Sequence, residues 1–244
     1  MKKRDLCSHW LDRLYHVRHH GPSVGTGGGA RPIETFYTAN SGRIFGQNGS
    51  VQNPAPADHL ILPELQQRWS PVIFSAAPVP DETLTRLFEA ARWAPSSSNE
   101  QPWSFVVATA AEPDLFAKFA ACLAPGNAWA KTAPVLALSV VRLHLSGEAK
   151  PNRYGFHDTG MAVGNLLAQA TAEGLFVHQM GGFDVEKARK DLRVPEGHDP
   201  GAMIAIGYYG DPDRAQAGLR DRELLPRTRK PLDEFVFRGT WGKR

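Results

Sequence analysis

An almost uninterrupted apolar run from Pro134 to Val141 is the feature that most constrains the fold of this 244-residue chain. A short apolar run of this kind is typical of a β-strand that is covered on both faces. It is well below the roughly 18 apolar residues that a membrane-spanning helix needs. Since 42% of the residues are apolar, the chain can bury one hydrophobic core. We therefore expect a soluble protein, not associated with a membrane, built around a buried sheet.

A helix is expected directly after Pro80, with Asp81 as its N-cap, and Pro95 should prevent its continuation. Its apolar residues have the i, i+3, i+4, i+7 spacing of one helix face: Leu84, Leu87, Phe88 and Ala91. A second long helix is expected from Asp158, as its cap, to about Gly174. Shorter helices are expected at 113–124 and 185–192, and further strands at 103–109, 175–180 and 202–209. This alternation predicts a sheet covered by helices.

Residues 1–57 differ in composition from residues 58–244, which carry the globular pattern. They hold eight of the 23 glycines, four of the nine histidines, and seven Lys or Arg against three Asp or Glu. Without a sustained apolar period they cannot bury enough surface to offset chain entropy, so we expect a disordered extension. The Arg-rich, acid-poor composition is also similar to that of a transit peptide, and a start codon assigned too far upstream would give the same pattern. These interpretations stay open at the level of sequence.

The charge pattern and the cysteines argue against several classes of protein. The net charge is +3, but basic and acidic residues alternate along most of the chain, unlike the basic stripes of nucleic-acid-binding proteins. Cys7 and Cys122 are far apart and lack the spacing of metal ligands, so we expect neither a disulfide framework nor a metal site. These features favour a protein of the reducing cytoplasm that binds no nucleic acid.

Sequence signatures of protein-based catalysis are missing. The chain has no GxSxG nucleophile motif, no HExxH motif and no cysteine with an obvious histidine partner. A cofactor enzyme does not need them, because the cofactor carries the reaction while the protein binds and orients it. We therefore expect no catalytic side chain, and instead a set of segments that together hold a cofactor.

Two basic segments, 67–70 and 227–232, are candidates for such a site. The first offers one guanidinium group and the second two, which can bind a phosphate through charge-assisted hydrogen bonds. The second leads into the apolar residues 235–237, which have a strand-like pattern. The candidate cofactor-binding residues of these two segments are Arg68, Trp69, Ser70, Arg227 and Arg229.

Two further segments are connections of unusual composition. Residues 95–103 form a connection that is longer than an ordinary turn, rich in side-chain donors and acceptors, and framed by two prolines. Residues 180–184 place paired glycines at the end of a predicted strand, where backbone N–H groups can approach a planar ligand closely. The candidate residues of these two segments are Pro95, Ser96, Ser97, Asn99, Gly181 and Gly182.

The order of these four motifs resembles the nitroreductase family of FMN enzymes. Arg-x-Ser, APSSxNxQPW, GGFD and RxRKPL follow one another between Leu65 and Phe237, and the second motif is the most specific of them. The resemblance implies an α+β fold with a mixed central sheet covered by helices. It also implies a homodimer, in which the C-terminal segment of each subunit reaches its partner and FMN lies between the subunits.

The resemblance assigns a role to each motif. The basic residues at 68 and at 227–229, with Ser70, would bind the phosphate, the ribityl chain or the pyrimidine edge of FMN. Charge-assisted hydrogen bonds are each worth roughly 1.5 to 3 kcal/mol, so several on one phosphate would retain it tightly. The loop at 95–99 would come from the other subunit and contact the isoalloxazine ring. The N–H groups of 181–182 would point toward flavin N5, the atom that accepts hydride, where fixed donors stabilise the reduced flavin.

Two positions depart from the pattern of many relatives with nitro-reducing activity. Gly181 stands where these relatives have a Glu, and Val72 stands where they have a basic residue. The first difference removes a side chain over the flavin edge, and the second removes a potential phosphate partner. Neither affects the fold that the resemblance implies, but both bear on the acceptor and on the choice between NADH and NADPH.

The resemblance thus implies an FMN-dependent oxidoreductase that passes hydride from NADH or NADPH, via the flavin, to a small electron-poor acceptor. Nitroaromatics, quinones and enones are such acceptors, and selectivity among them is expected to depend on Trp129, Tyr154, Phe156 and His157. Two alternatives stay open. One is flavin-dependent oxidation, dehalogenation or ring fragmentation of a specific metabolite, and the other is a flavin-binding protein without catalysis.

Overall fold

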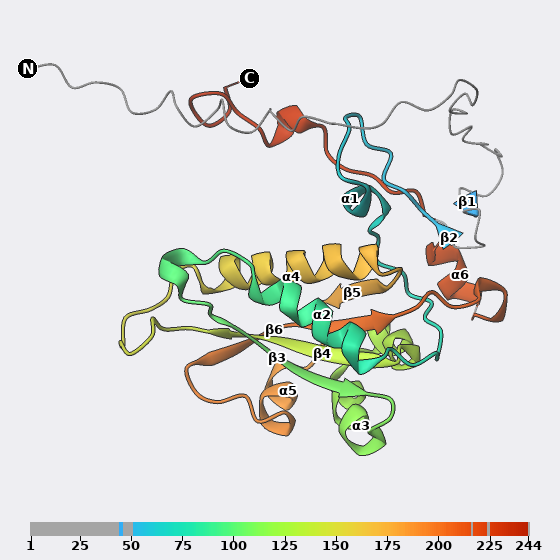
Figure 1. Ribbon diagram of the computed structural model, residues 1–244, viewed down its shortest axis with the longest axis horizontal. Helices are drawn as coiled ribbons and strands as arrows, with labels where there is room; N and C mark the ends of the chain where they lie inside the picture. Colours follow the sequence, from blue (N-terminus) through green and yellow to red (C-terminus); the bar gives the residue numbers. More distant parts are fainter. Residues whose placement is uncertain (1–43, 46–50, 216, 224, 244) are drawn as a thin grey trace, which may run out of the picture. The chain divides into compact units, whose positions relative to one another are not determined.

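A four-stranded sheet with the strand order β3-β4-β6-β5 forms the centre of the domain (Figure 1). The computed structural model describes residues 44–45, 51–215, 217–223 and 225–243. The strands of the sheet are β3 (Trp103–Thr109), β4 (Val135–Arg142), β5 (Phe176–Met180) and β6 (His198–Gly207). A separate two-stranded pair joins β1 (Ile44–Phe45) to β2 (Val51–Gln52).

Every neighbouring pair in the four-stranded sheet is antiparallel. The described strands therefore do not form the mixed sheet that the resemblance implies. Parallel neighbours need a crossover connection between adjacent strands, and here each described strand runs opposite to the strand beside it. Where β4 and β6 pair, the register shifts between Leu138 and Val140, and the Ser139 hydroxyl accepts a hydrogen bond from the Ala202 N–H at 2.9 Å.

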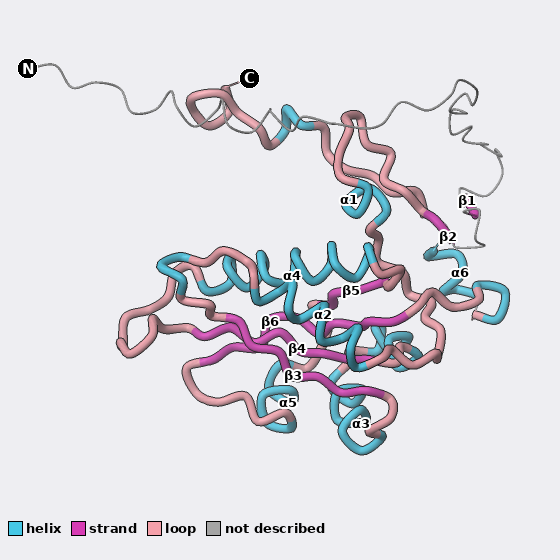
Figure 2. Tube along the Cα trace, viewed as in Figure 1, coloured by secondary structure: helices cyan, strands magenta, loops and turns pink. Residues whose placement is uncertain are grey.

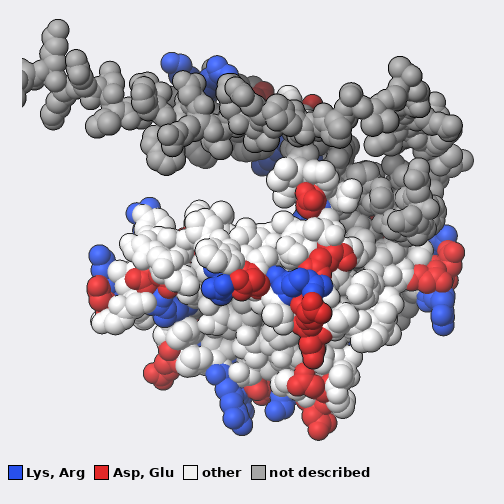
Figure 3. Space-filling model, in the orientation of Figure 1, with Lys and Arg blue, Asp and Glu red and all other residues white. Residues whose placement is uncertain are grey.

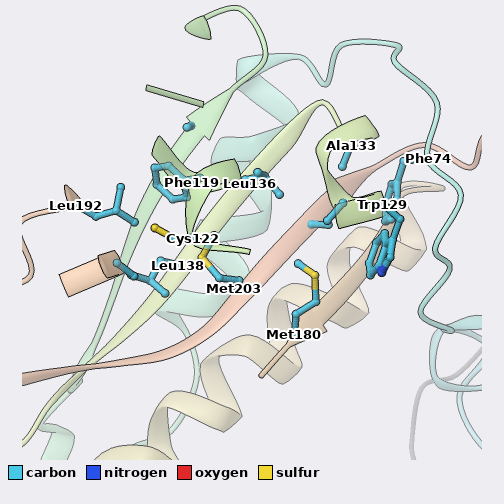
Figure 4. Packing of buried hydrophobic residues seen from close by; sticks show 14 of the residues in the cluster. Phe74, Phe119, Cys122, Trp129, Ala133, Leu136, Leu138, Met180, Leu192 and Met203 are labelled. Atoms are coloured by element: carbon cyan, nitrogen blue, oxygen red, sulfur yellow. The ribbon is translucent and has the colours of Figure 1, made fainter. Parts of the chain in front are cut away.

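The predicted burial of the apolar run on both faces is confirmed. Leu136 and Leu138 of β4 pack in one core cluster, whereas Val135 and Ala137 pack in the other. Successive strand residues point to opposite faces, so one strand serves both cores. Helices α3 (Pro113–Cys122) and α5 (Val185–Asp191) cover one face, and α2 (Asp81–Arg92) and α4 (Gly155–Ala172) cover the other (Figure 1). Figure 4 shows the first cluster, with Leu138 and Met203 near the Cys122 thiol.

The two long helices begin differently from the sequence prediction. Pro80 occupies the N-cap position of α2, and Asp81 is the first helical residue, so the prediction of an Asp81 cap is wrong. Because the extended conformation of Pro80 already ends the preceding segment, Asp81 can contribute through the helix dipole instead. Helix α4 begins at Gly155, which places Asp158 inside the first turn rather than at the cap. Its carboxylate accepts a hydrogen bond from another segment, the Ser97 N–H, at 3.0 Å.

The remaining elements are short. They are α1 (Pro63–Gln67), α6 (Ala217–Glu223) and the 3-10 turns at Ser97–Asn99, Pro125–Thr132, Pro212–Arg214 and Leu232–Glu234. The strand-like pattern at 235–237 does not give a strand, as Figure 2 shows. The Val236 N–H instead donates to the Leu232 carbonyl at 2.9 Å, which closes a helical turn.

The N-terminal extension predicted at 1–57 lies mostly outside the described residues, so its disorder and its boundary stay predictions. Within it, Ala55 donates a backbone hydrogen bond to the Gln66 carbonyl at 2.7 Å. Among the described residues no helix combines the length and the hydropathy needed to cross a membrane. Basic and acidic side chains are interspersed on the face of the molecule shown in Figure 3, as the sequence pattern predicts.

Candidate functional site

The two basic segments come together at one cavity of about 290 Å³. It is lined by all five candidate residues of these segments: Arg68, Trp69, Ser70, Arg227 and Arg229. Residues of the two segments, which are at least 157 positions apart in the chain, therefore share one cavity. Several guanidinium groups can reach one phosphate only if they come together in this way. Other residues contribute to the same wall, among them Asn53, His178, Arg222 and Glu223.

The electrostatics of this cavity favour an anion. Burial, together with the nearby Arg229 charge, lowers the pKa of Arg68. Burial also lowers the pKa of Arg227, with further contributions from Arg68 and Arg229. A lowered arginine pKa means that the charged form is less favourable here than in water, because like charges are held together in a partly desolvated place. A bound dianion would relieve this repulsion.

Arg227 also forms hydrogen bonds with the backbone of the neighbouring segments. Its Nη1 donates to the carbonyl oxygens of Asn53 and Gln66, and its Nη2 donates to the Arg68 carbonyl at 2.8 Å. These bonds use three of the five N–H donors of a guanidinium group. Arg227 therefore fixes the backbone that carries Arg68. Arg229 is more exposed, and its Nη1 donates to the adjacent Thr228 carbonyl at 2.7 Å.

Trp69 and Ser70 differ in burial and in their contacts. The Trp69 side chain is buried against the rings of Phe176 and Tyr209, with centroid distances of 5.7 and 5.4 Å. It supports the cavity wall, and its Nε1 is buried without a hydrogen-bond partner among the described residues. Ser70 is exposed, and its hydroxyl accepts a hydrogen bond from Arg68 Nη1 at 3.2 Å.

The loop at 95–99 adopts an unusual backbone conformation. Ser98 and Asn99 have φ angles of 51° and 56°, and Gln101 has 47°. Residues other than glycine rarely occupy this left-handed region, and each such residue costs of order 1 to 3 kcal/mol. Clusters of such residues occur at functional sites, where the surrounding structure holds them in place. Pro95 and Asn99 are exposed, and Ser96 and Ser97 are half-buried.

Two anchors hold this loop. Ser97 donates its N–H to Asp158 of α4 at 3.0 Å, on one side. On the other side, the Glu100 carboxylate accepts hydrogen bonds from Arg142 Nη2 at 3.0 Å and from the Ser146 N–H at 2.9 Å. Ser98 and Asn99 thus lie between two charge-assisted contacts, at Ser97 and Glu100, which hold the loop in one conformation.

The paired glycines follow β5, which is an edge strand and not a fully buried one. Gly181 has no heavy atom within 4 Å of the position that a Cβ would take, whereas the Gly182 position lies 2.8 Å from Asn127 Nδ2. That amide donates to the Gly182 carbonyl at 2.9 Å, which fixes the peptide. Gly181 therefore faces open space, whereas a side chain at 182 would displace the Asn127 amide.

The structure brings two of the four segments together and leaves the others apart. His178 of β5 lines the arginine cavity, and Gly181 follows three residues later, roughly 10 Å along an extended chain. The loop at 95–99 lies beyond the far end of α2, whose 12 residues span roughly 18 Å. No residue of this loop lines the arginine cavity.

The sequence reasoning missed several residues of the cavity, among them three ionisable ones: His178, Arg222 and Glu223. His178 alternates in β5 with Phe176 and Met180, so its position on a core-facing side was readable from the period-2 pattern. Arg222 and Glu223 lie in a run of alternating charges that looks like an ordinary solvated helix. Glu223 is nevertheless buried and accepts the N–H groups of Val72 and Ile73.

The residues expected to select an acceptor do not form one group. Trp129 is buried and its ring stacks on the Phe74 ring. The ring centroids of Trp129 and His178 are 4.6 Å apart. Tyr154, the N-cap of α4, and Phe156, in its first turn, are exposed and lie close in sequence to the Asp158 anchor. Only the latter pair, with the adjacent His157, is accessible next to the loop at 95–99.

The fold and the cavity define an α+β protein with helices on both faces of a four-stranded sheet and an arginine-lined cavity beside its edge strand β5. Residues 65–208 match the model of the nitroreductase family, and the chain belongs to this family.

Solved and curated proteins agree with this assignment. A crystal structure described as "the oxidoreductase containing FMN" is 34% identical, with a TM-score of 0.74, over 79% of this chain and 98% of that one. An uncharacterized 15.4 kDa protein of Mycolicibacterium smegmatis is 35% identical over 54% of this chain and 88% of that protein. A protein of Archaeoglobus fulgidus named "Putative NADH dehydrogenase/NAD(P)H nitroreductase" is 26% identical over 57% of this chain and 79% of its own length.

Proposed function

We propose that this protein is a homodimeric, FMN-dependent oxidoreductase that takes hydride from NADH or NADPH and delivers it to a small electron-poor acceptor. The observation that carries the proposal is the convergence of Arg68, Arg227 and Arg229 on one cavity. Three guanidinium groups at one small site suit a phosphate group, since each can form charge-assisted hydrogen bonds with its oxygens.

The residues present fit FMN. A cavity of about 290 Å³ lies at the lower end of the range for ligand pockets, so it suits the phosphate and ribityl end and not the whole cofactor. The planar ring would then extend along β5 toward Gly181 and Gly182. The open space at Gly181 leaves room for a ring, and the backbone there offers N–H donors. Flavin bound in this way would supply the hydride acceptor and donor of the reaction.

A second copy of the chain completes the site in this proposal. The loop residues Pro95, Ser96, Ser97 and Asn99 would come from the partner subunit and contact the ring. Large apolar side chains of the C-terminal segment are exposed in the single chain, namely Leu232, Phe235, Val236 and Trp241. Exposed apolar groups of this size are typical of interfaces, which supports a C-terminal segment that reaches the partner.

The reductant and the acceptor are inferred from the comparisons and from the family resemblance. NAD(P)H is named for the Archaeoglobus relative, and FMN for the crystal structure described above. A nitroaromatic, quinone or enone acceptor, and a cytoplasmic location, follow from the family resemblance and the composition. The exposed Tyr154 and Phe156 beside the 95–99 loop are aromatic surfaces on which a planar acceptor can stack.

Absorbance spectroscopy and flavin retention test this function. The purified protein should be yellow, and NADPH or NADH added under anaerobic conditions should bleach the flavin without any other substrate. Arg68→Ala should weaken FMN binding roughly 10- to 150-fold, the effect of losing one charge-assisted bond. Arg220→Ala is the matched control, because Arg220 is exposed and pairs with Asp213 at 3.2 Å.

Three results would each change the conclusion. A colourless protein that gains no FMN on reconstitution would refute the whole proposal. Equal FMN occupancy in the Arg68 and Arg220 variants would refute the role of Arg68. A yellow protein that neither NADH nor NADPH reduces would favour flavin binding without this catalysis, or oxidation of a specific metabolite.

A further inference from the structure

His178 is an ionisable side chain in the arginine cavity that the family motifs do not include. It projects from the middle of β5, is half-buried, and packs against the Trp129 ring. Its Nδ1 lies 2.7 Å from the Pro71 carbonyl oxygen. A carbonyl oxygen can only accept, so Nδ1 must carry a proton and donate it. Nε2 is therefore the atom at which the ring gains or loses its second proton.

The groups around His178 are mostly cationic. Four arginines line the same cavity. Arg68 directly follows α1, Arg222 belongs to α6, and Arg227 and Arg229 belong to the C-terminal segment. Glu223 is the one carboxylate among the described lining residues, and it accepts the backbone N–H groups of Val72 and Ile73. A second positive charge on His178 would add to this repulsion when no anion is bound.

Several causes act on the pKa of His178, and the net direction is downward. Burial has the largest effect and lowers the pKa, and the charges of Arg222 and Arg68 lower it further. Hydrogen bonds to the backbone of Pro71 and Ser70 raise the pKa. Two of these causes depend on the charge of the cavity. A phosphate dianion placed among the arginines would offset their repulsion and attract the imidazolium form. Ligand binding and proton binding at this site are therefore linked.

We propose that His178 is a phosphate-recognition residue of the flavin site, and that it takes up a proton at Nε2 when FMN binds and returns that proton when FMN leaves. The proposal rests on the proposed function, because it needs FMN in the arginine cavity. The role differs from that of the arginines, which stay charged in both states. His178 would add a positive charge only when the phosphate is present, and so would favour FMN over riboflavin.

The sign of the pH dependence follows from the linkage. If His178 binds a proton more tightly in the complex than in the free protein, FMN affinity rises as the pH falls through the interval between the two pKa values. Each unit between them corresponds to a tenfold change in affinity. The second pKa of the FMN phosphate is about 6. Because the arginines favour the dianion, the phosphate can only release protons when it binds. Net proton uptake therefore cannot come from the ligand.

Calorimetric titration of the flavin-free, full-length protein with FMN tests the proposal. Titrations in two buffers of different ionisation enthalpy give the number of protons bound with the ligand. A pH of about 7 is suitable because it is close to the range in which histidine titrates. We expect uptake of a fraction of one proton per site with FMN, and none with riboflavin. His178→Asn keeps an N–H donor for the Pro71 carbonyl but cannot titrate, so its uptake should be lost. His198→Asn, outside the cavity, should behave like the wild type.

The outcomes separate this inference from the proposed function. Uptake with FMN that disappears only in the His178 variant supports the inference. FMN binding without net uptake, or with uptake unchanged in His178→Asn, overturns it and leaves the proposed function standing. A protein that does not bind FMN overturns both. If His178→Asn does not fold, equal uptake with FMN and with riboflavin in the wild type would still refute phosphate recognition.

Discussion

Asp158 in the first turn of α4 accepts a hydrogen bond from the backbone N–H of Ser97, 61 residues earlier in the chain, at 3.0 Å. The Asp158 side chain is buried, and the loop that it holds contains residues in the left-handed backbone region. Helix α4 thus fixes the position of the loop that carries the most specific motif of the sequence. The loop geometry depends on a residue that lies outside that motif.

Removal of this anchor should loosen the loop. Asp158→Ala leaves the Ser97 N–H without its acceptor, and we expect a loss of about 1 to 3 kcal/mol in the free energy of unfolding. FMN affinity should fall as well, because the loop no longer holds one conformation. Urea denaturation and flavin titration measure the two effects. Asp158→Asn keeps an acceptor oxygen and should lose less, so equal losses in both variants would contradict the role of the hydrogen bond.

Glu223 should stabilise the segment that leads from Ser70 into the core. Its carboxylate accepts the N–H groups of both Val72 and Ile73, and Glu223→Ala leaves two buried donors without a partner. Each such group costs about 1 to 3 kcal/mol, so the free energy of unfolding should fall markedly.

Chemical denaturation measures this loss, and Asp221→Ala is the matched control because Asp221 is exposed on the same helix. Glu223→Gln retains a carbonyl oxygen as acceptor and should lie between the wild type and the alanine variant. A Glu223→Ala variant as stable as Asp221→Ala would show that α6 is not held by this contact.

Acid should weaken the second anchor of the loop. Hydrogen bonds from Ser146, and then the contact with Arg142, lower the pKa of Glu100. A carboxylate with a depressed folded-state pKa adds stability above its unfolded pKa of about 4.3, and this stability is lost as the pH falls through the folded value. The wild type should therefore lose more stability than Glu100→Gln when the pH is lowered from about 6 to about 3.

Urea midpoints at several pH values give this comparison. Glu148→Gln, an exposed position after β4, serves as the control and should retain the acid sensitivity of the wild type. Parallel stability curves for the wild type and Glu100→Gln would count against a contribution from this carboxylate.

The paired glycines should respond differently to substitution. A Cβ at 181 meets no atom within 4 Å, so Gly181→Ala should change the free energy of unfolding by less than about 0.5 kcal/mol. A Cβ at 182 would lie 2.8 Å from Asn127 Nδ2 and displace the amide that bonds the Gly182 carbonyl. Gly182→Ala should therefore cost about 1 kcal/mol, the net value of that hydrogen bond.

Thermal or urea unfolding of the double variant checks the cause. In an Asn127→Ala background the hydrogen bond is already absent, so Gly182→Ala should add little further loss. Additive losses in the double variant would mean that the Asn127 amide is not what limits position 182.

The sequence by itself determined the elements whose signal is local. The strand at 103–109 has the predicted bounds, the central apolar strand is shifted by one residue, and α2 and α4 occur where the 3.6-residue period indicates. These features could be predicted because alternation and helical spacing depend on neighbours within a few residues. The motif order likewise indicated the family, since it is a property of the chain alone.

Only the tertiary structure decided which distant groups meet. The antiparallel pairing, the hydrogen bonds from Arg227 to the 53–68 backbone, the contact between Asp158 and Ser97, and the place of His178 in the arginine cavity all join residues far apart in the chain. Such contacts depend on how whole helices and strands pack against one another. A charged residue that binds water and one that binds a buried partner have the same local sequence pattern, so packing alone distinguishes them.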